Sequence, residues 1–117
     1  GTLKLLGVVG LHAALRLIEE LGVESIAAEL TAKRRRLVGA LQSRGYSVLN
    51  PEPPPGRESG ITSAWREGTD LAAVQARLAE ARILVSLRTD RAGRNYLRFS
   101  PHAYNTDAEL DRALALL

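Results

Sequence analysis

The segment 50–56, Asn-Pro-Glu-Pro-Pro-Pro-Gly, constrains the fold more than any other feature of the sequence. Proline lacks a backbone N–H and fixes φ, so this segment cannot lie inside a helix or a central strand. It is therefore predicted to be a loop. We interpret it as a connection within one domain, because the residues before it lack enough strands to stand alone.

Two helices are predicted before the proline-rich loop. Residues 10–21 carry leucine and isoleucine at helical spacing, and a longer apolar line of the same period covers about 24–43. Gly22 separates the two helices, and glycine accepts the left-handed backbone that commonly ends a helix. We therefore expect a bend at Gly22 and an end to the second helix near Gly45.

The rest of the sequence alternates between strand and helix patterns. Strands are predicted at 46–49, 61–65, 83–88 and 96–100, and helices at 70–81 and 107–116. The short polar turn at 90–94 implies an antiparallel hairpin. The sequence Thr106-Asp107-Ala108-Glu109 fits a capping box at the start of the last helix.

This order, α-α-β-β-α-β-β-α, predicts a two-layer α+β domain. We expect a small, largely antiparallel sheet with helices packed on one face. The alternation within the last two strands places Tyr96, Arg98, Arg88 and Ser86 on the other face.

Composition narrows the possible functions. The chain has 117 residues, enough for one domain, and contains no cysteine, which excludes disulfides and thiolate chemistry. With two histidines, no metal site is expected. No apolar run reaches the roughly 20 residues of a membrane helix, and we expect no signal peptide and a cytoplasmic location. Methionine is also absent, so we expect a piece of a longer protein.

Arginine dominates the charged residues, with fourteen arginines, two lysines and a net charge of +3. Arg98 stands out because a charge within a strand is costly unless it is paired or meets water or a ligand. From the residues alone, the favoured interpretation is an arginine that pairs with an acid or covers the sheet, and Arg88 carries the same ambiguity. The run 33–36, Lys-Arg-Arg-Arg, is predicted to be a solvated helix face, and no nucleic-acid or membrane partner is expected.

The run 96–106, Tyr-Leu-Arg-Phe-Ser-Pro-His-Ala-Tyr-Asn-Thr, followed by an acidic helix, resembles the C-terminal signature of class V aminotransferase-fold enzymes. These are pyridoxal-phosphate (PLP) enzymes and include cysteine desulfurases, selenocysteine lyases, isopenicillin N epimerases and kynureninases. The start of the chain and the segments 59–63 and 83–88 follow the family order. The resemblance covers essentially the whole chain, and the part from Arg98 to Thr106 is its specific part.

The resemblance implies roles for three residues. Arg98 is similar to the family arginine that grips the substrate α-carboxylate, and Arg88 is a second candidate for substrate binding. Thr2 resembles a threonine that reaches the cofactor phosphate of the partner subunit in a dimer, although Leu3 replaces the proline that usually follows it. No catalytic residue is expected in this chain.

The Schiff-base lysine of the family lies in a large domain, and neither Lys4 nor Lys33 has its context. We therefore expect residues 1–117 to be the C-terminal small domain of a PLP enzyme that acts on an amino acid. This domain would bind the substrate carboxylate and help to form the cleft and a homodimer. It would hold no PLP covalently and be inactive without the large domain. The alternative is a free-standing, non-catalytic α+β module that binds an anionic ligand or partner.

Overall fold

The computed structural model describes residues 4–117, and its elements follow the predicted order. Within this part of the chain, the helices are α1 (Leu5–Leu21), α2 (Val23–Ser43), α3 (Leu71–Glu80) and α4 (Asp107–Ala115). The strands are β1 (Ser47–Val48), β2 (Thr62–Trp65), β3 (Ser86–Thr89) and β4 (Asn95–Phe99). The prediction of an α+β fold with the order α-α-β-β-α-β-β-α is confirmed.

The strands form one antiparallel sheet in the order β1-β2-β4-β3. The hairpin of β3 and β4 forms half of this sheet, and β2 pairs with the other edge of β4. Strand β4 therefore has a neighbour on each side, which makes it a central strand. This position matters for the site, because Arg98 belongs to β4.

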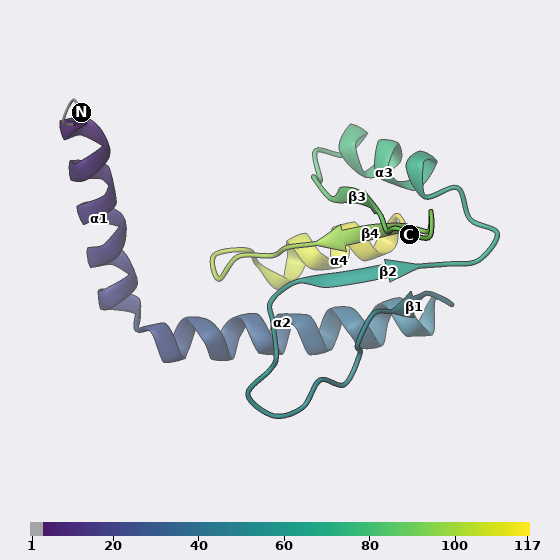
Figure 1. Ribbon diagram of the computed structural model, residues 1–117, viewed down its shortest axis with the longest axis horizontal. Coiled ribbons are helices and arrows are strands. Elements are labelled where there is room, and N and C mark those ends of the chain that lie inside the picture. Colours follow the sequence, from purple (N-terminus) through teal and green to yellow (C-terminus); the bar gives the residue numbers. More distant parts are fainter. Residues whose placement is uncertain (1–3) are drawn as a thin grey trace.

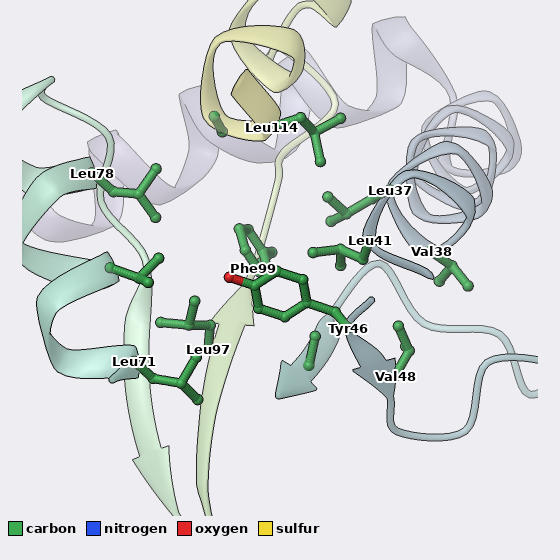
Figure 2. Packing of buried hydrophobic residues seen from close by; sticks show 13 residues of the cluster. Leu37, Val38, Leu41, Tyr46, Val48, Leu71, Leu78, Leu97, Phe99 and Leu114 are labelled. Carbon is green, nitrogen blue, oxygen red and sulfur yellow. The ribbon is translucent and has the colours of Figure 1, made fainter. Parts of the chain in front are cut away.

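Three helices cover one face of the sheet and form the core with it (Figure 2). Helix α2 lies against β1 and β2, α3 lies against β3 and β4, and α4 packs on α2. Leu37 and Leu41 of α2 and Leu78 of α3 are at most 1% exposed, as is Leu97 of β4. The core-facing positions alternate along the strands, as the period of two requires. The helices therefore leave the opposite face, which carries Arg98, open.

Helix α1 stands apart from the sheet (Figure 1). Its only close neighbour among the described elements is α2, and none of its residues is buried. Gly22, with φ of 82°, makes the predicted bend between the two helices. No helix in residues 4–117 has both the length and the apolar character needed to cross a membrane.

Two element boundaries differ from the prediction by more than one residue. Helix α1 begins at Leu5, five residues before the predicted start, because the helical pattern continues through Gly7. Strand β3 begins at Ser86 instead of at 83. Ser86 pairs with Arg98, and β4 ends one residue later at Phe99, so residues 83 and 84 have no partner strand, and the Val85 carbonyl accepts a hydrogen bond from Gln75.

The proline-rich loop is a connection within the domain, and a buried arginine anchors it. Arg34 of α2 is 5% exposed and donates hydrogen bonds to the carbonyl oxygens of Asn50, at 2.7 Å, and Pro51, at 3.3 Å. These carbonyls cannot be satisfied by a ladder, because prolines interrupt the strand. Arg34 thus joins the loop to α2.

Candidate functional site: an arginine face on the sheet

Arg98 lies on the face of the sheet that the helices leave open. Leu97 and Phe99, on either side of it in β4, are 0% and 5% exposed and point into the core. Successive strand side chains point to opposite faces, so Arg98 points away from the core. Its register partners are Ser63 of β2 and Ser86 of β3. Both serines are short, so the two positions directly opposite Arg98 in the neighbouring strands carry no bulky side chain.

The side chain of Arg98 has no partner within residues 4–117. It forms no ion pair with a described carboxylate, and its Nε atom is buried without a hydrogen-bond partner. Buried donors in proteins are nearly always hydrogen-bonded, and leaving one unpaired costs about 1–3 kcal/mol. The interpretation that Arg98 pairs with an acid of the described chain is therefore wrong. An arginine in this state is suited to bind an anionic group from outside these residues.

Arg88 lies on the same open face as Arg98. It pairs in register with Tyr96, and Ser86 pairs with Arg98, so the two arginines are diagonal neighbours across β3 and β4. Arg88 is exposed and forms no ion pair with residues 4–117. The four described strands contain no charged residue besides these two. The structure thus brings together both arginines predicted to bind substrate.

The hairpin turn next to this face is held by Asp90. One carboxylate oxygen accepts the backbone N–H of Arg94 at 2.9 Å, and the other accepts the hydroxyl of Tyr96 at 2.9 Å. The N–H of Arg94, and after it the hydroxyl of Tyr96, hold the pKa of the Asp90 carboxyl below its usual value. Trp65 meets Tyr96 edge-on at 5.2 Å, and the Arg94 guanidinium lies 5.0 Å from the Trp65 ring. The Asp90 carboxylate is therefore engaged in the turn.

The polar loop after β4 uses most of its side chains locally. Asn105 accepts the backbone N–H of His102 at 2.7 Å, and Thr106 and Glu109 form the predicted capping box. The N–H of Thr106, and after it the Asn105 side chain, lower the pKa of the Glu109 carboxyl. Tyr104 is exposed and its ring stacks on His102 at 5.0 Å. Asn105 and Thr106 thus shape the turn that follows the Arg98 strand.

The basic run 33–36 is not a uniformly solvated face, so that prediction is wrong for half of it. Lys33 and Arg34 are only 8% and 5% exposed. Each cation of the run has a partner within the chain: Lys33 with Glu29 and the Ala103 carbonyl, Arg34 with the carbonyls of 50 and 51, Arg35 with Glu58, and Arg36 with Asp107 and Asp111. The run thus joins α2 to three other segments. That no nucleic acid binds stays a prediction.

A groove of about 740 Å³ lies between α2 and the loop that precedes α4. Residues 28–36 of α2 and 103–107 line it. Lys33 spans one side of it, because its Nζ atom is 2.8 Å from Glu29 and 3.2 Å from the Ala103 carbonyl oxygen. The helical periodicity gave one signal for this contact: Lys33 and Leu37 are four residues apart and share a helix face. The contact with a loop about seventy residues later could not be predicted from spacing.

The family model for aminotransferase class-V matches residues 1–113. The chain therefore belongs to the class V aminotransferase family, whose members have the fold of PLP enzymes. The predicted resemblance is confirmed.

Solved structures share this fold. The apo cysteine desulfurase from Thermococcus onnurineus has a TM-score of 0.87 and 23% identity, and the match covers 99% of this chain and 31% of that one. The cysteine desulfurase CsdA from Escherichia coli has a TM-score of 0.83 and 21% identity, with coverages of 99% and 30%. A NifS-like protein has a TM-score of 0.80 and 25% identity, with coverages of 98% and 33%. A comparison with curated protein sequences found no match. The chain thus spans about a third of the length of these structures.

Residues 4–117 do not by themselves fit PLP. A lasting Schiff base needs a free lysine that is shielded from water, but the Lys33 ammonium is buried and bound to Glu29, and Lys4 is exposed to water at the start of α1. Thr2, predicted to contact the cofactor phosphate, lies outside the described residues. Within residues 4–117, no group of three or more acidic or histidine side chains could hold a metal ion.

Proposed function

We propose that this chain is the C-terminal small domain of a PLP-dependent class V enzyme that acts on an amino acid. Its part is to bind the substrate α-carboxylate through Arg98 and to help close the cleft. The observation that carries the proposal is the Nε atom of Arg98, which is buried, unpaired and on the open face of a central strand. Family membership supports the same role, because the family model covers the segment with Arg98, which resembles the carboxylate-binding arginine of the family.

The chemistry of the arginine side chain suits this role. A guanidinium is planar and presents two parallel N–H donors to the two oxygens of a carboxylate. The backbone of β4 is held by strands on both sides, so it fixes the position of the guanidinium. Arg98 therefore orients the amino acid, and the cofactor and the reacting groups belong to the large domain that we propose lies upstream.

The exposure of α1 supports the proposal that the domain works within a larger protein. Leu5, Leu6 and Leu11 are 66%, 91% and 60% exposed, and they lie on different sides of the helix. A helix that is apolar all round is normally buried. We propose that a large domain, and in a homodimer the second subunit, cover it. A free-standing module would leave this surface in water, so the observation counts against that alternative.

The hairpin turn supports a parent enzyme that does not form a persulfide. One group of desulfurases carries a catalytic cysteine after the strand that ends here with Arg88 and Thr89. In this chain the segment forms a short turn closed by Asp90, and the sequence contains no cysteine. We therefore propose a lyase, an epimerase or an aminotransferase-like enzyme.

The role of Arg98 can be tested in the longer protein by replacing it with glutamine. A charge-assisted pair contributes about 1.5–3 kcal/mol, so Arg98→Gln should lower kcat/KM for the amino acid about 10- to 100-fold. Arg57→Gln is the matched control, because Arg57 is an exposed arginine of the proline-rich loop that forms no ion pair with the described residues. Equal kcat/KM values for both variants and the unmodified enzyme would rule out the carboxylate role.

A further inference from the structure

The open face of the sheet has a charge pattern that one carboxylate does not explain. Both charged residues of the described strands, Arg88 and Arg98, are cations, and both lie on this face. The nearest acid along the hairpin, Asp90, is engaged by the turn and by Tyr96. The two guanidinium groups repel each other, because no carboxylate lies near to neutralise them. Binding of an anion between them, or to each of them, is therefore favoured.

Arg88 has no ion-pair or side-chain hydrogen-bond partner among residues 4–117, unlike half of the arginines in this part of the chain. Arg34, Arg36 and Arg77 each donate to a carbonyl or a carboxylate of the described residues. Arg88 does neither, although it stands on a strand next to the Arg98 strand. An exposed arginine without a partner is common, but here its position is fixed by a two-strand ladder beside a second unpaired arginine.

The spacing of the two arginines suits a ligand with two anionic groups. Diagonal neighbours on one face of an antiparallel pair have Cα atoms about 7–8 Å apart, within reach of each other for long side chains. Two guanidinium groups at this spacing can bind the two ends of a short dianion, each through its own pair of N–H donors. If Arg98 holds the α-carboxylate, Arg88 is placed for an anion on the side chain.

We propose that Arg88 is a specificity-determining residue and that the substrate is an amino acid with an anionic side chain, a carboxylate or a phosphate. This inference rests on the proposed role of Arg98. Tyr96, which lies opposite Arg88 in the ladder and is tied to Asp90, holds the hairpin at the position from which Arg88 reaches the side-chain anion.

The test is equilibrium binding of unreactive acids to the longer protein, measured by isothermal titration calorimetry. Propionate offers one anionic group, succinate offers two carboxylates, and carboxyethylphosphonate offers a carboxylate and a phosphonate. We expect at least one of the dianions to bind about tenfold or more tightly than propionate, which is the contribution of one charge-assisted pair. The dianion that binds more tightly identifies the side-chain group.

Variants separate this inference from the proposed function. Arg88→Gln should abolish the preference for the dianion and leave propionate binding unchanged, Arg88→Lys should restore part of the preference, and Arg57→Gln should change nothing. Arg98→Gln should weaken binding of all the acids. Equal binding of propionate and both dianions, with Arg98→Gln still weakening it, would overturn the role of Arg88 alone. No effect of Arg98→Gln on any acid would overturn the proposed function itself.

Discussion

Asp90, in the hairpin turn, and Arg98, on the open face of the sheet beside it, are two charged residues in different states. Asp90 has its hydrogen bonds within the hairpin, from backbone N–H groups and from Tyr96. Arg98 has none with residues 4–117, and its Nε atom is buried. The carboxylate of Asp90 has its hydrogen bonds within the turn, whereas Arg98 combines an unpaired Nε with a place on the open face of the sheet, where an anion from outside these residues can reach it. We therefore assign Asp90 to the stability of the turn and Arg98 to ligand binding.

The hydrogen bonds of Asp90 predict how the free energy of unfolding depends on pH in acid. Its hydrogen bonds lower the pKa of the folded carboxyl below the unfolded value of about 3.9, so the contribution is fully present above that pH. It is lost as the pH falls further, through the pKa of the folded state. In Asp90→Asn, the free energy of unfolding should therefore fall less steeply with pH below about 4. The measurement is chemical denaturation at a series of pH values.

The control for this experiment is Glu52→Gln, which removes an exposed carboxylate of the proline-rich loop that accepts no side-chain hydrogen bond in the structure. It should leave the slope nearly unchanged. An Asp90→Asn variant with the same slope as the unmodified chain would show that the turn does not depend on the ionised carboxylate.

At the scale of elements, the basic segment of α2 fixes the loop that follows the Arg98 strand. The Lys33 ammonium bonds Glu29 on its own helix and the carbonyl of Ala103 in the loop. One turn further along, Arg36 pairs with Asp107 at 3.0 Å and with Asp111 at 2.6 Å, both in α4. These contacts hold the end of β4 and the start of α4 against α2.

Removing the Lys33 contact should destabilise the fold. Lys33→Met keeps the length of the side chain but leaves the Ala103 carbonyl without this donor, so the free energy of unfolding should fall by about 1–2 kcal/mol. Lys4→Met removes the same charge at an exposed position and should change it by less than about 0.5 kcal/mol. Denaturant unfolding of both variants measures the difference. Equal values for the two variants would contradict the anchoring role.

The elements were predictable where local patterns set them. The bend at Gly22 and the capping box at Thr106 follow from local residue types, and both are confirmed. The start of β3 was not predictable, because it depends on where β4 ends. The alternation that places Arg98 and Arg88 on one face was readable from the strands. The sequence did not show that Ser63 lies opposite Arg98. That neighbour depends on the register between β2 and β4, which are distant in the sequence.

At the scale of the whole molecule, the exposed α1 is the least expected feature. The helix stands apart from the core that α2, α3, α4 and the sheet form, and none of its residues belongs to that core (Figure 1). A packed core within residues 23–117 needs nothing from α1. The proposed large domain or second subunit gives these side chains a partner, and the coverage of about a third of the solved structures leaves length for it.

One substitution in α1 can show whether the helix is covered in the longer protein but exposed in chain 1–117 alone. Leu11→Ala should change the unfolding free energy of chain 1–117 by less than about 0.5 kcal/mol, because Leu11 is 60% exposed there. In the longer protein it should cost about 2 kcal/mol or more, as burial of the side chain predicts. Leu41→Ala, in the core, should cost about 2–5 kcal/mol in both. A Leu11→Ala change that is harmless in both proteins would mean that nothing covers α1.

The most direct test of the central claim is the visible absorption spectrum of the longer protein and of chain 1–117, each incubated with PLP and then dialysed. We predict that the longer protein keeps the absorption band of a PLP Schiff base and that this band changes when an amino acid is added. Chain 1–117 should keep no band after dialysis, because Lys33 is bound to Glu29 and a Schiff base on the exposed Lys4 would be open to hydrolysis. A folded longer protein without the band, or a band retained by chain 1–117, would contradict the account.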